Sequence, residues 1–371
     1  MGNITLKGFF VILVLSIILT ACTTGAPTSP LTEAPAQMPP TGEPTTPPEP
    51  VATEESVPPP EPAETLEPFK LKVLVLPYQA YAPFFIAKEE GYYAEQGLDV
   101  EFVRMEKSGE FTPALAQGQL DVAADLLNVG TLNAIAKGSQ IKYVADKGFF
   151  DPESCTYTAW MARKDLLESG VLDDLKNLAG MKIAASSATT IEYFFDTMVK
   201  DVGLSSADAE FMNLPPADRL EALKTGAIDI TNVAEPWILR IKNAGAGDVW
   251  RPIEKEFPNF AFSILMFGPN LLEKNPEVGK RFMIAYLKAI QKYNEGKTDR
   301  NIEIISKYTE QTPEELMQMC WQSIVPDGKL NLQSVLDFQE WAVAKGYVDA
   351  ALTEEQLWDP SFIEYANEAL K

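Results

Sequence analysis

Apolar runs and segments of helical period alternate along the chain from residue 69 onward. The run KLKVLVLP at 70–77 predicts a buried strand, and the stretch from about Pro83 to Glu95 predicts a helix. Further predicted strands are LDVEFV (98–103), LDVAAD (120–125) and IKYVAD (141–146), with helices between them near 112–117 and 129–137. Strands that alternate with helices of this length are typical of a parallel sheet, which binds ligands at the carboxyl ends of its strands.

A second series of the same kind begins at GMKIAA (180–185). It continues with a helix near 191–202, AEFMNL (209–214), a helix near 217–225 and AIDITNV (227–233). CTYTAWMA (155–162) and FAFSILMFG (260–268) are extended segments on either side of this series. We therefore expect two α/β lobes, 69–158 with 260–371 and 159–259, joined by two crossings that form a hinge over a cleft. The amphipathic helices beyond Pro276 are expected to pack on the first lobe.

The first 68 residues have the pattern of a targeting signal followed by a linker. Residues 1–21 contain Lys7, an apolar run and small residues before Cys22, which predicts a secretion signal, with an uncleaved membrane anchor as the alternative. The sequence LTAC at 19–22 resembles a bacterial lipobox, which implies lipid attachment to Cys22 and anchoring at the outer face of the cell membrane. Residues 23–68 contain no Lys, Arg or aromatic residue and are rich in Pro, Thr and Glu, so they are expected to form an extended acidic linker.

The composition excludes several classes of function. The 53 acidic and 31 basic residues give a net charge of −22, which disfavours nucleic acid as a partner. The chain has no histidine, so every catalytic or zinc site that depends on imidazole is excluded. Cys22, Cys155 and Cys320 lack metal-binding spacing, and no cofactor is expected. Cys155 and Cys320 could be buried thiols or a disulfide.

Four segments in order resemble a known family. They are APFFIAKEEGYYAEQGLDVEF (82–102), ALAQGQLDVAAD (114–125), GMKIAASSATTIEYFFDTMV (180–199) and GAIDITNVAEPW (226–237). Together they are similar to the extracytoplasmic solute-binding proteins of ABC importers, in the branch of alkanesulfonate, taurine, nitrate, thiamine-pyrimidine and riboflavin binders. The resemblance implies a bilobal α/β fold of the type II periplasmic-binding class, a role in transport rather than catalysis, and partners among ABC permease and ATPase subunits.

The same resemblance places candidate contacts at the cleft. From the first lobe these are Tyr78, Gln79, Tyr81, Asp125 and Asn128, with Trp160 on a crossing and Ser186, Ser187, Thr189, Thr190, Glu192, Asn232, Glu235 and Trp237 from the second lobe. The four hydroxyl residues precede a helix, where one of them would serve as an N-cap in any case. For Glu192 a solvated helix face is the favoured alternative. Phe84 and Phe85 could be core or cleft residues.

The motifs expected at the cleft contain no Arg or Lys, so a neutral or weakly cationic flat heterocycle is the preferred ligand. Riboflavin is the first candidate, and a thiamine pyrimidine precursor or an alkanesulfonate is the alternative. Two other classes are a ligand sensor that feeds a membrane kinase and an enzyme similar to the pyrimidine synthases. The absence of histidine disfavours the enzyme.

Overall fold

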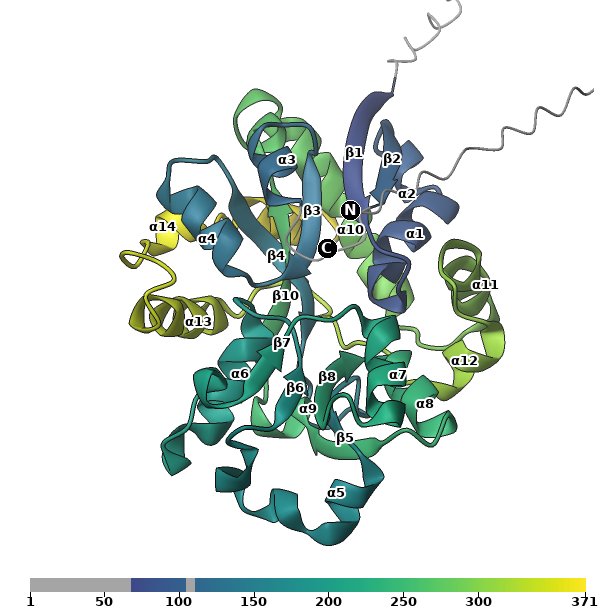
Figure 1. Ribbon diagram of the computed structural model, residues 1–371. Coiled ribbons are helices and arrows are strands. Elements are labelled where there is room, and N and C mark those ends of the chain that lie inside the picture. Colours follow the sequence, from purple (N-terminus) through teal and green to yellow (C-terminus); the bar gives the residue numbers. More distant parts are fainter. Residues whose placement is uncertain (1–67, 105–110) are drawn as a thin grey trace, which may run out of the picture. The chain divides into compact units, whose positions relative to one another are not determined.

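The computed structural model describes residues 68–104 and 111–371 and contains two five-stranded sheets (Figure 1). The first sheet has the order β2-β1-β3-β10-β4, and the second has the order β7-β6-β8-β5-β9. The first consists of β1 (Phe69–Val75), β2 (Leu98–Arg104), β3 (Val122–Leu126), β4 (Lys142–Phe149) and β10 (Ala261–Phe267). The second consists of β5 (Thr158–Ala162), β6 (Lys182–Ala184), β7 (Glu210–Met212), β8 (Ile230–Ala234) and β9 (Asp248–Pro252).

The two-lobed α/β fold expected from the sequence is confirmed, but each sheet is mixed rather than parallel. Strand β10 runs antiparallel to both of its neighbours, β3 and β4. Strand β5 likewise runs antiparallel to β8 and β9. Every residue of β5 and of β10 is buried. Because a strand buried on both faces shows no alternation of polar and apolar residues, its sequence carries no sign of its direction.

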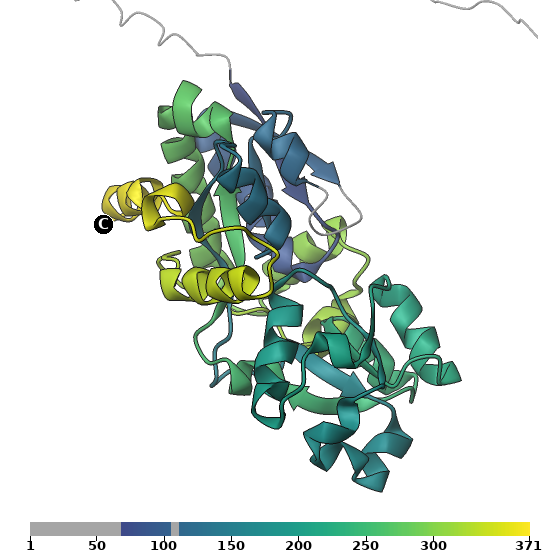
Figure 2. The same ribbon diagram turned by 60° about the vertical axis from the view of Figure 1, so that its left-hand side comes forward.

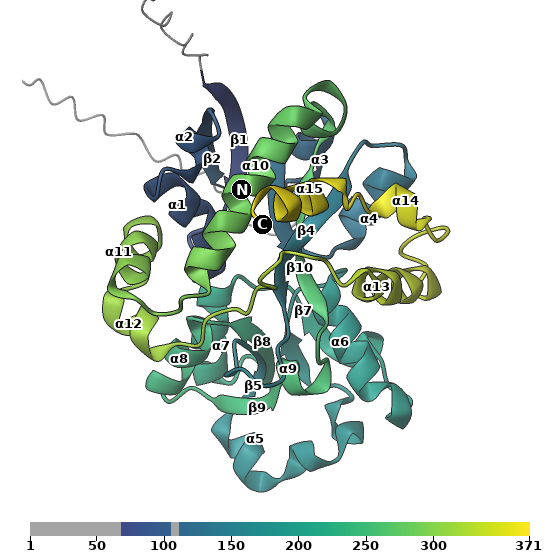
Figure 3. The ribbon, with the colours of Figure 1, turned by 180° about the vertical axis from the view of Figure 1, so that it is seen from behind.

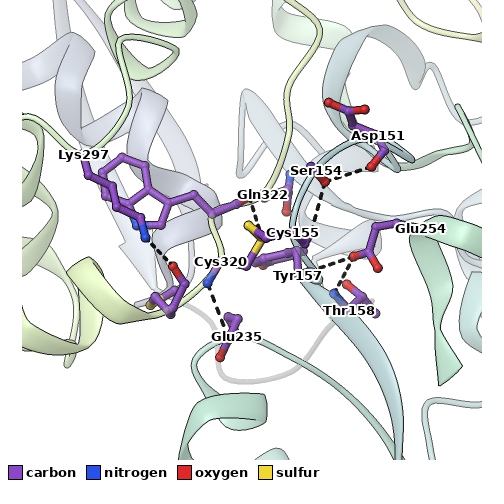
Figure 4. Close-up of a disulfide and its surroundings, with 12 residues drawn as sticks. Asp151, Ser154, Cys155, Tyr157, Thr158, Glu235, Glu254, Lys297, Cys320 and Gln322 are labelled. Carbon is purple, nitrogen blue, oxygen red and sulfur yellow. Dashed lines mark hydrogen bonds between the residues drawn. A yellow bond between two sulfur atoms is a disulfide. The ribbon is translucent and has the colours of Figure 1, made fainter. Parts of the chain in front are cut away.

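The chain passes between the sheets twice, from β4 to β5 and from β9 through α9 (Ile253–Glu256) to β10. A third segment, which follows α12 (Pro313–Gln318), runs beside the first crossing, where Phe149 and Ser323 form an isolated antiparallel bridge. Figure 4 shows the disulfide between Cys155 and Cys320 that joins these two segments, with 5.7 Å between the Cα atoms. Cys155 and Cys320 are therefore bonded to each other and are not the buried free thiols that the sequence had left as the alternative.

Seen from behind, the long helix α10 (Pro276–Tyr293) lies across the first sheet with α15 (Ser361–Ala369) beside it (Figure 3). The other helices of this lobe are α1 (Ala82–Glu89), α2 (Tyr92–Glu95), α3 (Thr112–Ala116), α4 (Val129–Ala136), α11 (Asp299–Tyr308) and α14 (Glu354–Leu357). The single helix predicted over 83–95 is two helices, because Gly91 adopts a left-handed conformation with φ of 77° between them.

The second sheet is covered by α5 (Lys164–Ser169), α6 (Thr190–Val199), α7 (Pro216–Thr225) and α8 (Trp237–Asn243). Helix α13 (Leu332–Ala344) contacts α6 as well as β10, so it joins the C-terminal region to both lobes (Figure 2). Short helical turns complete the fold: η1 (Gln79–Tyr81), η2 (Val171–Asp173), η3 (Leu175–Leu178), η4 (Lys200–Val202), η5 (Ser206–Asp208) and η6 (Asn270–Lys274).

Phe84 and Phe85 both belong to the core of the first lobe. The Phe84 ring stacks on Tyr286 with 5.3 Å between centroids, and the Phe85 ring stacks on Tyr308 at 4.7 Å. Both phenylalanines are fully buried, which explains why aromatic residues gather at the start of α1.

Within the part of the chain that the structure describes, no helix has both the length and the apolar character needed to cross a membrane. The predicted signal segment at 1–21, Cys22 and the linker as far as residue 67 lie outside the described residues.

Candidate functional site

A cleft of about 610 Å³ lies between the two lobes, and residues from both sheets and from the crossings line it. Its wall includes the last residues of β3 and β8 and the segments that follow β1, β6 and β8. These are the carboxyl ends of neighbouring strands, which is where the sequence placed a ligand site. The volume is within the ordinary range for a small-molecule pocket.

Nine of the residues expected at the cleft do line it: Tyr78, Tyr81, Asp125, Ser186, Ser187, Thr189, Asn232, Glu235 and Trp237. Their contact with a solute stays a prediction. The cleft also receives residues that the sequence did not single out as contacts, among them Phe262, Ser263 and Gln322. Phe262 and Ser263 belong to β10, and no motif marked that strand as part of a site.

Five aromatic residues from both lobes and the crossings line this cleft: Tyr78, Tyr81, Tyr157, Trp237 and Phe262. The Tyr81 hydroxyl donates a 2.7 Å hydrogen bond to the Ala124 carbonyl, and burial raises the pKa of Tyr81 well above its usual value. The Trp237 ring has the Arg240 guanidinium carbon 5.1 Å from its centroid. The rings therefore offer surfaces on which a flat molecule can stack.

Four of the expected contacts lie away from the cleft for reasons of packing. Gln79 is fully buried, donates to the Tyr293 hydroxyl at 2.5 Å and accepts from the Gln322 backbone at 3.3 Å. Trp160 packs edge-on against Phe195 inside the second lobe. Asn128 caps α4 by accepting from the Thr131 backbone, and Thr190 is fully buried at the start of α6. We do not propose these residues as ligand contacts.

Glu192 also lies away from the cleft, in a buried cluster between α6 and α13. Its Oε1 accepts hydrogen bonds from the Ser206 hydroxyl at 2.7 Å and the Tyr347 hydroxyl at 2.9 Å. Lys345 Nζ lies 3.5 Å from the same oxygen and 2.8 Å from Asp196 Oδ2. We call Glu192, Asp196, Ser206 and Lys345 the α6–α13 ion cluster. At 3% exposure Glu192 is not on a solvated helix face either.

The two lobes touch beside the cleft through their backbones. The Val129 amide donates to the Ala188 carbonyl at 2.9 Å, and the Thr190 amide donates to the Leu127 carbonyl at 3.1 Å. Asn128 and Thr189 form the corresponding antiparallel bridge. The segment that carries Ser186 and Ser187 is thus held by the first lobe, and Glu192 Oε2 accepts from the Ala188 amide at 2.7 Å. The ion cluster and the wall of the cleft are therefore connected.

Two buried cations line the cleft, which corrects the expectation that its wall is only neutral or acidic. They are Lys147, in β4, and Arg219, on α7. Burial lowers the pKa of Lys147 to about 8, although the nearby Asp125 and Asp146 carboxylates oppose that shift. Burial also lowers the pKa of Arg219 to about 10. Neither residue lies in a segment that was assigned to the cleft from the sequence. The expectation of a cleft without Arg or Lys therefore overlooked both.

Glu235 lines the cleft, but backbone donors already hold its carboxylate. Its oxygens accept from the Leu239 amide at 3.0 Å and from the Cys320 amide at 3.4 Å. Figure 4 shows the second of these bonds. Burial is the main cause that raises the pKa of Glu235 above its usual value, and these two hydrogen bonds oppose the rise. Glu235 therefore positions the start of α8, which carries Trp237, next to the disulfide.

Asp146, beside Lys147 in β4, is a buried carboxyl group that should make the stability of the fold depend on pH. It is fully buried, Oδ2 accepts from the Val325 amide, and Oδ1 has no hydrogen-bond partner among the described residues. Burial raises its pKa to about 7. Between about pH 4 and 7 the unfolded chain loses this proton while the folded protein keeps it, so this group makes stability fall as the pH rises.

We expect Asp146→Asn to raise the free energy of unfolding at pH 8 by at least about 1 kcal/mol and to change it little at pH 4. Urea unfolding at both pH values measures the effect. Asp201→Asn, at an exposed position, is the control. Equal stability of Asp146→Asn and the parent protein at pH 8 would contradict this account of the buried carboxyl.

No group of three or more His, Cys, Asp or Glu side chains within the described ranges could hold a metal ion. The cleft offers aromatic side chains, hydroxyl groups and charged groups for binding.

Comparison with known proteins identifies similar chains. Residues 79–295 match the family described as NMT1/THI5 like. The bicarbonate transport ATP-binding protein CmpC of Synechocystis sp. is 29% identical over 203 residues, which are 49% of this chain and 29% of CmpC. The yeast 4-amino-5-hydroxymethyl-2-methylpyrimidine phosphate synthase THI11 of Saccharomyces cerevisiae is 29% identical over 107 residues, which are 29% of each chain.

The nitrate/nitrite binding protein NrtA of Synechocystis sp. is 23% identical over 256 residues, which are 61% of this chain and 54% of NrtA. The crystal structure of NrtA superposes with a TM-score of 0.66 at 18% identity and covers 82% of this chain and 90% of that one. The sequence matches thus span less than two thirds of the length of each of these three relatives. The superposition shows a shared fold.

Proposed function

We propose that this chain, which belongs to the NMT1/THI5-like family, is the solute-binding component of an ABC importer. It would capture a small solute outside the cytoplasm and deliver it to a membrane permease that works with an ATPase subunit. The proposal further includes anchoring through a lipid on Cys22. The names of CmpC and NrtA, a transport ATP-binding protein and a nitrate/nitrite binding protein, support a role in transport.

One observation carries the proposal: a cleft of about 610 Å³ lies between two lobes and takes its wall from both. A solute that contacts both lobes stabilises the closed arrangement over an open one, so that closure reports occupancy. In this structure the two lobes are joined beside the cleft by the backbone hydrogen bonds at Ala188 and Thr190.

For the solute we propose a flat heterocycle, with riboflavin as the first compound to test. The support is the set of aromatic rings around a cleft of about 610 Å³. Because Lys147 and Arg219 line the same cleft, the charge of its wall does not favour a neutral ligand. These two cations favour a second candidate, an acidic solute such as an alkanesulfonate.

An enzyme of the pyrimidine synthase class is a weaker alternative. The match to the yeast synthase covers 29% of this chain. A chain without histidine cannot use an imidazole in catalysis. A thermal shift series with riboflavin, a thiamine pyrimidine, an alkanesulfonate, nitrate and bicarbonate tests the proposed function. A rise in the melting temperature with one of them supports solute capture, and no rise with any of them contradicts it.

Trp237→Ala is expected to weaken riboflavin binding at least about 10-fold, because it removes one stacking surface and its apolar area. Quenching of flavin fluorescence during a titration measures the dissociation constant. Trp250→Ala is a matched control, because Trp250 also has an arginine 5.1 Å from its ring, Arg251, but does not line the cleft. Equal losses in the two variants would mean that Trp237 does not contact the flavin.

A further inference from the structure

Two buried hydroxyl groups at the wall of the cleft have no hydrogen-bond partner among the described residues. They belong to Thr158 and Ser263, and each of these residues is 2% exposed. The hydroxyl group of Thr190 also lacks a described partner, but Thr190 is not part of this wall. Most buried polar side-chain atoms in proteins are hydrogen-bonded, and an unpaired one costs free energy. The fold thus keeps two polar groups at the cleft that it does not use itself.

The two residues lie where the crossings enter the lobes. Thr158 is the first residue of β5, which follows the first crossing, and Ser263 is the third residue of β10, which follows the second. Strand β5 belongs to the second sheet and β10 to the first. One hydroxyl group therefore comes from each lobe, and both lie at the side of the cleft next to the crossings, which we call the hinge side. A solute that contacts both is held by both lobes at once.

The backbone of Thr158 is held in place although its hydroxyl group is not engaged. Glu254 Oε1 accepts hydrogen bonds from the Tyr157 amide at 2.9 Å and from the Thr158 amide at 2.7 Å (Figure 4). Glu254 belongs to α9, in the second crossing, so its carboxylate ties the two crossings together beside Thr158. The protein therefore positions Thr158 at the hinge side through its main chain.

Ser263 lies at an irregular point of its strand. It pairs with Leu126 in β3 and with Gly148 in β4, and the register with β4 shifts on both sides of Ser263. Irregularities of this kind are common next to functional sites, where they change the direction of a side chain. The break in the register is thus a second observation that marks Ser263 as part of a site.

Two other buried hydroxyl groups show how the fold ordinarily satisfies such a group. Thr231, in the strand β8 that pairs with β5, donates to the Ala184 carbonyl at 2.8 Å. Ser334, on α13, accepts from the Ala261 amide at 2.9 Å. Both residues are at most 1% exposed, and neither is part of the wall of the cleft. They are matched references for the threonine and the serine at the hinge side.

We infer that Thr158 and Ser263 are specificity-determining residues, whose hydroxyl groups form hydrogen bonds with the solute at the hinge side of the cleft. The inference rests on the proposed function, because it gives a role to two residues of the same cleft. A hydroxyl group can both donate and accept, so the pair recognises a carbonyl, amide or hydroxyl group of the solute. A solute with an apolar edge at this place would leave both hydroxyl groups unpaired, and the cleft rejects it for that reason.

The first measurement needs no solute. Thr158→Val and Ser263→Ala remove the hydroxyl groups with little change in shape, and both full-length variants should melt at the temperature of the parent protein or above it. Thr231→Val and Ser334→Ala each break a hydrogen bond, so both controls should melt at least about 2 °C lower. Thermal unfolding followed by circular dichroism measures the four shifts. Losses at the hinge side as large as those of the controls would overturn the inference, because both hydroxyl groups would then stabilise the fold.

The second measurement is a titration of the same proteins with riboflavin, followed by quenching of flavin fluorescence. Thr158→Val and Ser263→Ala should each bind about 3- to 10-fold more weakly than the parent protein, which is the value of one hydrogen bond. The two controls should bind as the parent protein does. Weaker binding together with an unchanged or higher melting temperature distinguishes a lost solute contact from a damaged fold. A loss in only one variant overturns the role of the other residue.

If riboflavin does not bind, the probe is the compound of the thermal shift series that stabilises the parent protein, and calorimetry gives its dissociation constant. Equal affinity of that probe for the parent protein and for both hinge-side variants overturns the inference and leaves the proposed function in place. If no compound of the series stabilises the parent protein, the proposed function fails and the inference fails with it. The two failures are therefore distinguished by whether the parent protein binds a probe.

Discussion

Replacing both Cys155 and Cys320 by alanine is expected to lower the melting temperature by about 8 °C. The disulfide links residues that are 165 positions apart in the chain. In the chain-entropy account a link over a loop of this length destabilises the unfolded state by about 5 kcal/mol. The variant loses that contribution, while the buried core of each lobe is unchanged. Thermal unfolding followed by circular dichroism measures the shift.

The local structure gives a second reason for the effect. The bond joins the first crossing between the lobes to the segment that carries Gln322, a residue at the cleft (Figure 4). Cys320 also donates its backbone N–H to Glu235. A reductant should lower the melting temperature of the parent protein to that of the double variant and should leave the double variant unchanged. A parent protein that melts at the same temperature with and without reductant would contradict the stabilising role of the bond.

Lys345→Met is expected to lower the free energy of unfolding by about 2 to 3 kcal/mol. The Lys345 ammonium lies 2.8 Å from Asp196 and 3.5 Å from Glu192, and it donates to the Ser206 hydroxyl at 2.9 Å. Methionine removes the cation and leaves two largely buried carboxylates close together. We expect a smaller loss of unfolding free energy than for breaking a fully buried ion pair, because the lysine side chain is 22% exposed.

Lys224→Met is the control for this prediction. Lys224 pairs with Glu221 on the exposed surface of α7, where both side chains are well solvated. Such a pair contributes at most about 1 kcal/mol. Urea unfolding of the two variants should show a large loss for Lys345→Met and a small one for Lys224→Met. Similar losses would mean that the α6–α13 ion cluster does not fasten α13 to the second lobe.

The sequence predicted the parts of the fold that depend on the spacing of apolar residues. The strands at 70–77, 98–103 and 120–125, and the helices between them, follow from local periodicity. Residues at the carboxyl ends of these strands, such as Tyr78 and Asp125, could therefore be placed at the cleft before the structure was known. The direction of β5 and β10 could not be predicted, because a fully buried strand has no alternating face.

Gln79 and Glu192 do not line the cleft because their side chains contact segments that are far away in the chain. Glu192 lies at the first turn of α6, where a solvent-exposed or a ligand-facing carboxylate would be equally natural. Its partners Lys345 and Tyr347 are more than 150 residues away, and no local pattern reveals them. Arg219 was missed for the opposite reason, since a charged residue on an amphipathic helix is ordinarily a surface residue.

The most direct test of the account is a fluorescence titration of riboflavin with the purified protein, followed by the same titration with Trp237→Ala. Saturable quenching with a dissociation constant at or below about 1 µM, weakened at least about 10-fold in the variant, is the result that the account predicts. A flavin signal that stays unchanged up to about 1 mM protein would contradict the flavin proposal.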